Sequence, residues 1–320
     1  MMINPTIKIV TDRITKRSEA TRSLYLNKMN DARKEGPKRA HLSCGNQAHA
    51  YAPVPEDQKR LIDGAGGNIG IINAYNDMLS AHQPFEKYPD IIKKAARLAG
   101  GTAQVAAGVP AMCDGITQGQ TGMELSLFSR DAIAMSAAIG LSHNVFDTTV
   151  YLGVCDKIVP GMIISAATFG HLPAVFLPAG PMTTGQSNDE KAKIRQDFAE
   201  GKANRSDLMA SEMASYHGPG TCTFYGTANT NQMLMEFMGL HLPGSSFVNP
   251  NTPLRDALTD FGAKHALSIS DLSSNYIPVS KVLDEKAYVN GIVGLMATGV
   301  STNLLIHLIA MARASGIIID

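Results

Sequence analysis

Three short segments of the sequence combine cysteine with carboxylate, lysine or glycine. A Cys-Asp-Lys tripeptide occupies residues 155–157, a Cys-Asp pair occupies residues 113–114, and Cys222 follows the glycine-rich run HGPGT. Thiolates are soft ligands that suit iron–sulfur clusters, whereas carboxylates suit hard cations such as Mg²⁺. These residue types are therefore compatible with an iron–sulfur cluster beside a Mg²⁺ ion.

The spacing of the cysteines leaves two interpretations open. Cys113, Cys155 and Cys222 lie tens of residues apart, which is too far for a zinc finger or a ferredoxin-type ligand run, so the fold would have to assemble a shared centre. The alternative is that each is a core residue, because free cysteine is among the most buried residue types. With Cys44, the chain has four cysteines, too few to indicate a disulfide framework.

The segments that must position these residues alternate between strand-like and helix-like patterns from residue 68 onward. Apolar runs rich in Ile, Val and Ala are separated by helix-length segments, which is typical of βαβ units. We expect an α/β fold, with a parallel sheet covered by helices on both faces and additional helices. The predicted strands are 68–75, 103–108, 148–154 and 174–180, and the predicted helices between them are 85–98, 123–139 and 161–169.

The flanking regions are mostly helical or irregular. The pattern predicts a helix over 18–35, a long loop to residue 67, and further helices at 189–200, 205–216, 227–238, 254–267, 285–296 and 303–314. Residues 316–320 resemble the start of a strand, which usually continues into a further element, so we expect the chain to be part of a longer protein. The expected organisation is an N-terminal helix and loop extension over 1–67 and an incomplete α/β domain over 68–320.

The cysteine segments are predicted to lie where α/β proteins bind ligands. Cys155 directly follows the predicted strand 148–154 and precedes a helix that begins near Pro160, at the carboxyl end of a strand. Cys113 and Cys222 each lie in a glycine-rich loop before a predicted helix. At Cys222, the positive end of the helix dipole favours a thiolate.

Charge and hydropathy argue against several classes of partner. The 28 Lys and Arg residues balance 28 Asp and Glu residues, whereas nucleic-acid or anionic-membrane binding needs an excess of basic side chains. The longest apolar stretches, 132–141 and 304–311, fall short of the ~18–20 residues that a bilayer crossing needs. The N-terminus shows no apolar leader pattern, so we expect a cytoplasmic location.

Six motifs, taken in order, resemble those of the iron–sulfur dehydratase family, which includes dihydroxy-acid and sugar-acid dehydratases. They are NAYNDMLSAHQPFEKYPD, VPAMCDGITQGQTGMELSLFSRD, VCDKIVPGM, LPAGPM, GTCTFYGTANTNQMLMEFMGLHLPGSSFVNP and TGVSTNLLIHLIA. The segments TDRITKRS and SCGNQAHAYA resemble the branch of this family that acts on 6-phosphogluconate. The likeness covers essentially the whole chain.

This resemblance implies a set of metal-binding residues. The family cysteines that match Cys155 and Cys222 bind the cluster, which in this branch is of the 4Fe-4S type. The carboxylates that match Asp114 and Asp156 bind Mg²⁺ (or Mn²⁺). The lysine that matches Lys157 is carbamylated in some relatives and then bridges to the metal, and it is expected to be catalytic. The alternative for Lys157 is an ordinary surface lysine in a salt bridge.

One position departs from the family pattern. Some relatives carry a third cluster cysteine where this sequence has Ala81, so the third ligand is left open between Cys113, Cys44 and no protein ligand. The neighbouring His82 is either a substrate contact or a hydrogen-bonded structural residue.

Two polar motifs have structural and functional interpretations. The SxxSR motif over 126–130 is interpreted as a helix-face anchor in preference to a carboxylate site. Residues 301–303 either cap the following helix or line the active site.

The resemblance also implies the reaction. A homodimer would convert 6-phospho-D-gluconate to 2-dehydro-3-deoxy-6-phospho-D-gluconate and water, a step of the Entner–Doudoroff pathway, with the cluster and Mg²⁺ as Lewis acids. The family's serine base and a further Glu ligand lie in a C-terminal domain beyond residue 320, so residues 1–320 alone are expected to be inactive. The alternatives are a dehydratase for another sugar acid or 2,3-dihydroxy acid, and a non-catalytic iron–sulfur redox or oxygen-sensing module.

Overall fold

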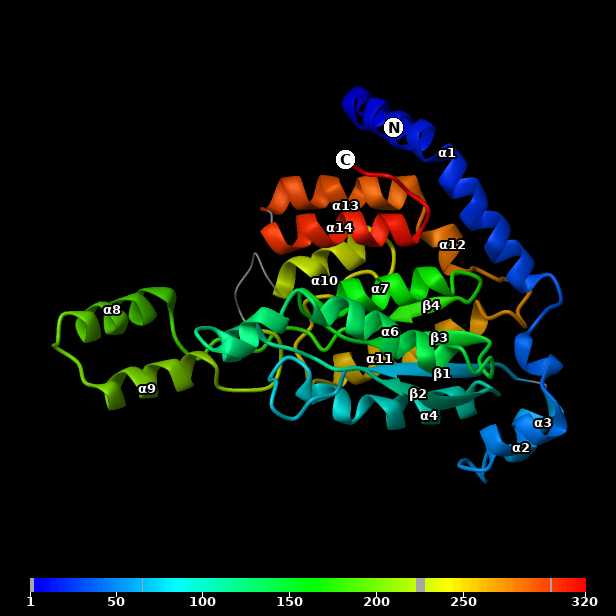
Figure 1. Ribbon diagram of the computed structural model, residues 1–320. Helices are drawn as coiled ribbons and strands as arrows, with labels where there is room; N and C mark the ends of the chain where they lie inside the picture. The colour runs from blue at the N-terminus through cyan, green and yellow to red at the C-terminus, as the bar shows by residue number, and fades with distance from the viewer. Residues whose placement is uncertain (1–2, 65, 223–227, 300) are drawn as a thin grey trace.

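A parallel β-sheet forms the centre of the protein. The structure, a computed structural model, describes residues 3–64, 66–222, 228–299 and 301–320. In these ranges four parallel strands are arranged in the order β2-β1-β3-β4 (Figure 1). Their bounds are Asn68–Asn73 for β1, Thr102–Gly108 for β2, Thr148–Leu152 for β3 and Ala174–Phe176 for β4. The predicted α/β fold with a parallel sheet is confirmed, although β4 is shorter than the predicted strand 174–180.

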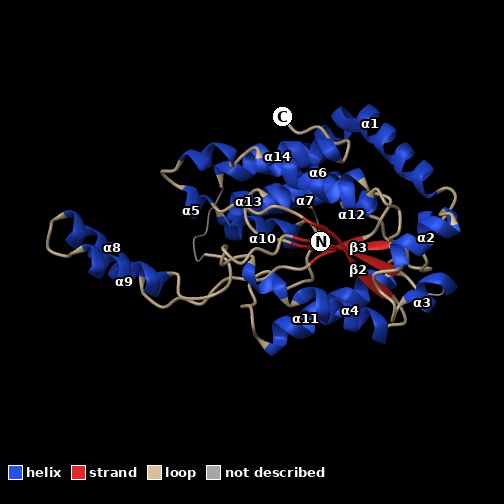
Figure 2. Cartoon of the chain, turned by 60° about the horizontal axis from the view of Figure 1, so that its bottom comes forward, coloured by secondary structure: helices blue, strands red, loops and turns tan. Residues whose placement is uncertain are grey.

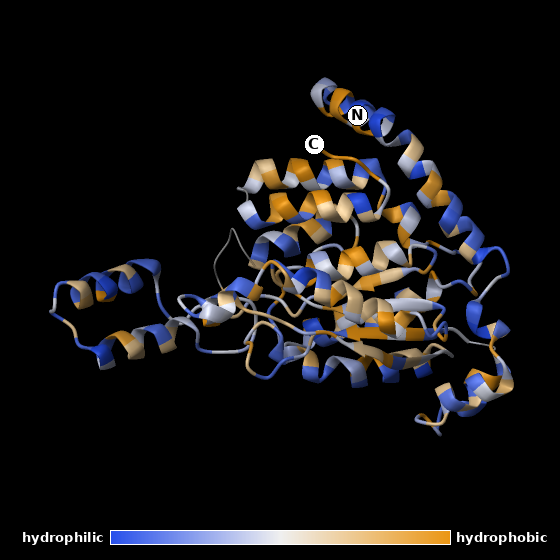
Figure 3. Cartoon of the chain, viewed as in Figure 1, coloured by the Kyte–Doolittle hydropathy of each residue, from blue (hydrophilic) through white to orange (hydrophobic). Residues whose placement is uncertain are grey.

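Helices cover both faces of this sheet. Helices α4 (Tyr88–Leu98) and α11 (Pro253–Ser268) pack on one face, and α6 (Ser129–Leu141) and α7 (Ile158–Thr168) lie on the other (Figure 1). Hydrophobic residues are concentrated in the strands and in the helices stacked on them, as Figure 3 shows. Every residue of β3 is buried, as expected of a strand that is covered on both faces.

A further layer of helices lies outside α7. Helix α14 (Thr302–Ala314) packs on α7, and α13 (Glu285–Thr298) packs on α10 (Ala228–Phe237) (Figure 1). The long helix α1 (Pro5–Arg33) then packs against α13. Short helices after β1 include α5 (Asp114–Thr117), α12 (Val279–Val282) and the 3-10 helices η2 (Gln83–Glu86) and η3 (Thr121–Leu125).

Two helices project from this body as a hairpin. Helices α8 (Asn188–Ala199) and α9 (Arg205–Ser215) pack on each other and extend away from the sheet (Figures 1 and 2). Each begins with a capping box, formed by Ser187 with Glu190 and by Asn204 with Asp207. Their bounds agree with the predicted helices 189–200 and 205–216.

The prediction of a long loop before residue 68 is wrong. This segment contains the 3-10 helix η1 (Lys38–His41) and helices α2 (Cys44–Tyr51) and α3 (Gln58–Asp63). Ser43 caps α2 with its side chain, and Gly64 ends α3 with a left-handed φ of 67°. These local signals could have been found in the sequence, but the abundance of Gly, Pro and His concealed them.

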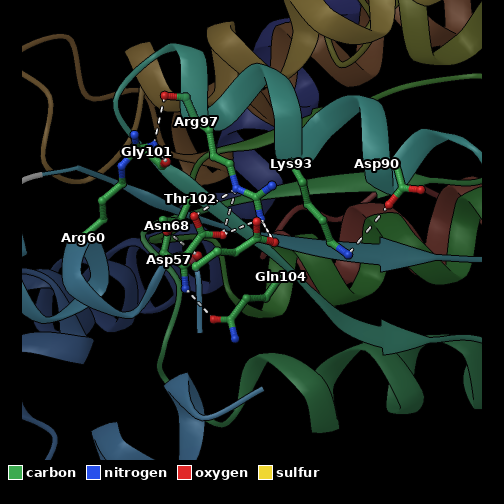
Figure 4. A network of polar contacts seen from close by, with 10 residues as sticks. Asp57, Arg60, Asn68, Asp90, Lys93, Arg97, Gly101, Thr102 and Gln104 are labelled. Atoms are coloured by element: carbon green, nitrogen blue, oxygen red, sulfur yellow. Dashed lines mark hydrogen bonds and ion pairs between the residues drawn. The ribbon is translucent and has the colours of Figure 1, made fainter. Parts of the chain in front are cut away.

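Polar contacts hold this N-terminal segment to the start of the sheet. Arg97 of α4 pairs with Asp57, and Arg60 of α3 donates to the Arg97 carbonyl oxygen at 3.0 Å (Figure 4). At the start of β1, Asn68 accepts from Thr102 at 2.9 Å and donates to Gln104 at 3.0 Å (Figure 4). The segment is therefore packed at the amino-terminal ends of the strands.

Both chain ends also differ from their predicted structure. Helix α1 begins at Pro5 and not at residue 18, because Asn4 accepts a capping hydrogen bond and Pro5 occupies the first turn. Residues 316–320 form no strand. They lie beside α1, where the Ile318 amide donates to Ser18 at 2.9 Å. The predicted helix 123–139 is likewise interrupted, since α6 begins only at Ser129.

A buried ion pair at this end of the sheet gives a testable contribution to stability. Arg39 Nε donates to Asp147 at 2.6 Å, and the same carboxylate accepts from the Asn68 amide at 2.7 Å. Burial raises the pKa of Asp147, and the charge of Arg39 opposes that shift. We expect Arg39→Ala to lower the free energy of unfolding by about 3 kcal/mol, because a buried carboxylate loses its partner.

Urea denaturation would measure this effect. The matched control is Lys8→Ala, which removes an exposed lysine paired with Asp12 and should change the unfolding free energy by less than about 0.5 kcal/mol. Equal effects of the two substitutions would contradict the prediction.

Candidate active site

The loops after β2 and β3 bring several predicted site residues to one edge of the sheet. Cys113 ends the loop after β2 as the N-cap residue of α5, and Asp114 is the first residue of that helix. The segment 155–157 lies between β3 and α7. Both segments therefore follow the carboxyl ends of strands, as the sequence predicts. Ligands bind at this edge of the sheet in α/β proteins.

Lys157 joins the two loops through its ammonium group. The side chain is fully buried, and Nζ forms ion pairs with Asp114 and with Asp156, the latter at 3.0 Å. The alternative of an ordinary surface lysine is therefore excluded. A buried charge needs such partners, because it has lost its hydration.

Two further side chains hold these carboxylates. Ser126 Oγ donates to Asp114 Oδ1 at 2.7 Å, and Asn303 Nδ2 donates to Asp156 Oδ2 at 2.9 Å. The sequence favours a structural role for Ser126 and leaves Asn303 open between a cap and the active site. Ser301, at the N-cap of α14, makes no side-chain capping bond, so this motif reaches the site through Asn303.

The backbone at Cys155 has an unusual conformation. Its φ of 76° lies in the left-handed region, which residues other than glycine rarely adopt. His82 supports the preceding residue, because its Nε2 lies 3.1 Å from the Val154 carbonyl oxygen. His82 is fully buried, and burial lowers its pKa to about 4, so the ring is neutral at pH 7. These contacts support the structural role of His82.

The thiol of Cys155 lies in a region that disfavours a free thiolate. Burial raises the pKa of Cys155 well above its ordinary value, and the charges of Asp156, Cys222 and Cys113 raise it further. A thiolate here would be stabilised by a metal ion, whose positive charge would replace the missing hydration.

Cys222 is positioned by backbone contacts with the loop after β4. The Thr221 amide donates to the Gly180 carbonyl oxygen at 3.0 Å, and the Met182 amide donates to the Thr221 carbonyl oxygen at 2.9 Å. Asn229 of α10 donates to the Cys222 carbonyl oxygen at 2.8 Å. The cysteine therefore has a defined position, although residues 223–227 lie outside the described part of the chain.

The last residue of the SxxSR motif contacts the outer helix layer. Arg130 donates to His307 Nδ1 at 3.3 Å, and burial, followed by the charge of Arg130, lowers the pKa of His307 to about 4. Ser129 donates to the Ser126 carbonyl oxygen at 2.6 Å. This motif therefore joins α6 to α14 and also reaches Asp114 through Ser126.

The donor set at this edge combines soft thiols, on Cys113, Cys155 and Cys222, with the hard carboxylates of Asp114 and Asp156. Among the residues that the structure describes, no three His, Cys, Asp or Glu side chains are arranged to hold one metal ion. Cluster cysteines bind different irons, so they lie further apart than the ligands of one ion. The Lys157 ammonium also holds Asp114 and Asp156, where it supplies the positive charge that these carboxylates need.

No helix in the described ranges is long and apolar enough to cross a membrane.

Comparison with known proteins gives consistent matches. Residues 67–320 match the family model described as dihydroxy-acid/6-phosphogluconate dehydratase N-terminal. The chain is 62% identical over its whole length to a phosphogluconate dehydratase of Rhizobium meliloti, of which it covers 53%. It is 59% identical, over 99% of its length, to a phosphogluconate dehydratase of Escherichia coli, of which it also covers 53%.

A more distant relative carries another name. The chain is 34% identical to a dihydroxy-acid dehydratase of Acetivibrio thermocellus, over 91% of this chain and 51% of the relative. The chain thus spans about half the length of the curated relatives that it matches.

Proposed function

The chain belongs to the dihydroxy-acid/6-phosphogluconate dehydratase family, and from this premise we propose that the protein dehydrates 6-phospho-D-gluconate to 2-dehydro-3-deoxy-6-phospho-D-gluconate. The observation that carries the proposal is the buried Lys157 between Asp114 and Asp156, directly after Cys155. The choice of substrate rests on identity, which is 62% to a phosphogluconate dehydratase and 34% to a dihydroxy-acid dehydratase.

We propose that Cys155 and Cys222 hold a 4Fe-4S cluster, and that Asp114, Asp156 and Lys157 hold Mg²⁺ or Mn²⁺. When bound, these groups supply Lewis acidity, which acidifies the C2 proton and makes the C3 hydroxyl a better leaving group. Soft thiols and hard carboxylates on adjacent loops support this division of ligands. The proposed reaction is a step of the Entner–Doudoroff pathway.

Lys157 is the residue of this chain on which the hard-cation site depends. As an ammonium, it neutralises two carboxylates in a buried position. As a carbamate, it would add a third anionic oxygen group, and only a multivalent cation could then balance the site. Ser126 and Asn303 keep the two carboxylates oriented in either state, because they bond to Asp114 and Asp156 directly.

Cys155 and His82 are buried, so bulk water does not reach these two side chains. Exclusion of water strengthens the electrostatic interactions that develop as a proton leaves C2 and hydroxide leaves C3. The enol that results takes up a proton at C3 and gives the 2-keto-3-deoxy acid, with one water molecule released.

The proposal also covers the domain organisation, the cellular location and the oligomeric state of the protein. We propose that residues 1–67 are an N-terminal extension of the dehydratase domain over 68–320, and that the whole protein is a cytoplasmic homodimer. The α/β body and the packing of α1 on α13 support one continuous unit in this region. The substrate is a small anionic sugar acid. Because the net charge of the chain is zero, positive groups close to the site must bind it.

The first test is substrate competition on the full-length protein, purified without oxygen. We expect kcat/KM for 6-phosphogluconate to exceed the values for gluconate and 2,3-dihydroxyisovalerate by at least about a hundredfold. A preference for either competitor would instead identify a dehydratase for another sugar acid or dihydroxy acid.

A second test separates a dehydratase from an iron–sulfur sensor. We expect Asp156→Asn to lower dehydratase activity at least tenfold and to leave the cluster iron per chain unchanged, because the carboxylate serves the hard cation. The control is Asp260→Asn, in an exposed pair with Lys264. Absence of dehydration by the unaltered protein, with an intact cluster that responds to oxygen, would favour the sensor.

A further inference from the structure

The cluster proposed above still lacks a protein ligand for a third iron, and two cysteines are available. Cys44 is exposed in the first turn of α2, and Cys113 is partly buried at the start of α5. In the loop after β1, Ala81 occupies the position where some relatives carry a third cluster cysteine. Its side chain is buried and has no donor atom. The positions of Cys44 and Cys113 in the fold therefore indicate which thiol can reach the cluster.

Cys44 lies at the wrong end of the sheet. Helix α2 packs at the amino-terminal ends of the strands, where Gln104 donates to the Ala50 carbonyl oxygen at 3.0 Å. Residues of α2 also line a pocket with Val145 and Phe146, which precede β3. Figure 2 shows α2 and α3 on the opposite side of the sheet from α5. This helix would have to leave its packing to bring a thiol to Cys155.

Cys113 lies in the loop that the ion pair of Lys157 fixes to the Cys155 loop. Cys113 directly precedes Asp114, and Cys155 lies two residues before Lys157. Because Lys157 contacts Asp114, each thiol lies within two residues of one and the same ion pair. Consecutive Cα atoms are about 3.8 Å apart, so this arrangement keeps the two cysteines close.

The surroundings of Cys113 also leave its thiol available. Although Cys113 is the N-cap residue of α5, its side chain makes no capping hydrogen bond. Cys222 joins Cys113 and Cys155 at this edge of the sheet, because the Thr221 amide bonds to the Gly180 carbonyl oxygen in the loop after β4. The three cysteines come from three different loops at the carboxyl edge of the sheet, as the spacing in the sequence requires.

We infer that Cys113 is the third protein ligand of the cluster, a role that rests on the proposed iron–sulfur function. On binding, the Cys113 S–H bond breaks, its proton goes to solvent, and a sulfur–iron bond forms without any change of oxidation state. A cluster held by these three cysteines would have one iron without a cysteine ligand among the described residues.

Thiol labelling of the full-length protein would test this role. The protein is prepared without iron and after anaerobic reconstitution with iron and sulfide, each form is treated with iodoacetamide, and labelling is measured by mass spectrometry. We expect labelling of Cys113, Cys155 and Cys222 to fall at least tenfold on reconstitution. Cys44 should be labelled equally in both forms.

The outcomes distinguish this inference from the proposed function. Protection of Cys155 and Cys222 with unchanged labelling of Cys113 would overturn the inference and leave the proposed function intact. Protection of none of the three would overturn both. Protection of Cys44 in place of Cys113 would also overturn the inference.

Spectroscopy of a matched pair of variants excludes simple shielding by the cluster. Cys113→Ser should alter the electron paramagnetic resonance spectrum of the reduced cluster and shorten its lifetime in air at least threefold. Cys44→Ser should change neither. Circular dichroism verifies that both variants fold, and an unchanged spectrum and lifetime in Cys113→Ser would overturn the inference.

Discussion

Replacement of Lys157 by methionine is expected to lower kcat/KM for dehydration of 6-phosphogluconate by at least about a thousandfold. The side chain is fully buried, and its ammonium holds Asp114 and Asp156 together. Methionine has a similar length but no charge, so two carboxylates at one site would repel each other and move apart. The carbamate proposed for this lysine would be lost as well.

The same substitution should also lower the free energy of unfolding of the metal-free protein by about 3 kcal/mol. The matched control is Lys59→Met, which removes an exposed ion pair with Asp63 on α3. We expect that control to leave both stability and turnover essentially unchanged, because the pair is exposed to solvent. Activity of Lys157→Met above a tenth of the unaltered value would contradict the proposed role.

Much of the sheet could be predicted because its signals are local. Runs of Ile and Val bounded by helix-length segments indicate buried parallel strands, and all four predicted strands lie in one parallel sheet. The order of the strands could not be predicted in this way, because it depends on contacts between distant segments. Strand β4 ends at Phe176 because Pro178 has no amide hydrogen to continue the ladder, and this local signal was present in the sequence.

The site was predictable only in part. Asp114, Asp156 and Lys157 were identified by resemblance to a family, and nothing in their spacing indicates that Lys157 contacts both carboxylates. Asn303 illustrates the limit most clearly. It lies far along the sequence from Asp156, and only the packing of α14 on α7 brings its amide to that carboxylate.

The role of Cys113 shows why sequence could not decide between two cysteines. Both Cys44 and Cys113 lie next to glycine in the sequence or within two residues of it, and each begins or precedes a short helix. The sheet separates them, because one helix packs at the amino-terminal ends of the strands and the other follows a carboxyl end. That difference is a property of topology and not of local pattern.

Replacement of Gly220 by alanine is expected to lower the cluster content of the protein at least tenfold and its activity at least a hundredfold. Gly220 has a φ of 126°, and a Cβ there would lie 2.4 Å from the Met182 amide nitrogen. Its own amide donates to the Ser80 carbonyl oxygen at 2.7 Å. A side chain would therefore force the backbone of residues 220–222 away from the loop after β4 and displace Cys222 from the other two cysteines.

A neighbouring glycine provides the control for that prediction. A Cβ added to Gly218 would meet no atom within 4 Å, and its φ is not left-handed, so Gly218→Ala should retain the cluster. Iron and sulfide per chain after anaerobic reconstitution measure the difference, and circular dichroism verifies the fold of both variants. If Gly220→Ala kept a full cluster, the contacts of Thr221 with Gly180 and Met182 would not be what positions Cys222. Loss of the cluster in Gly220→Ala alone would show that a ligand cysteine depends on a close backbone approach two residues before it.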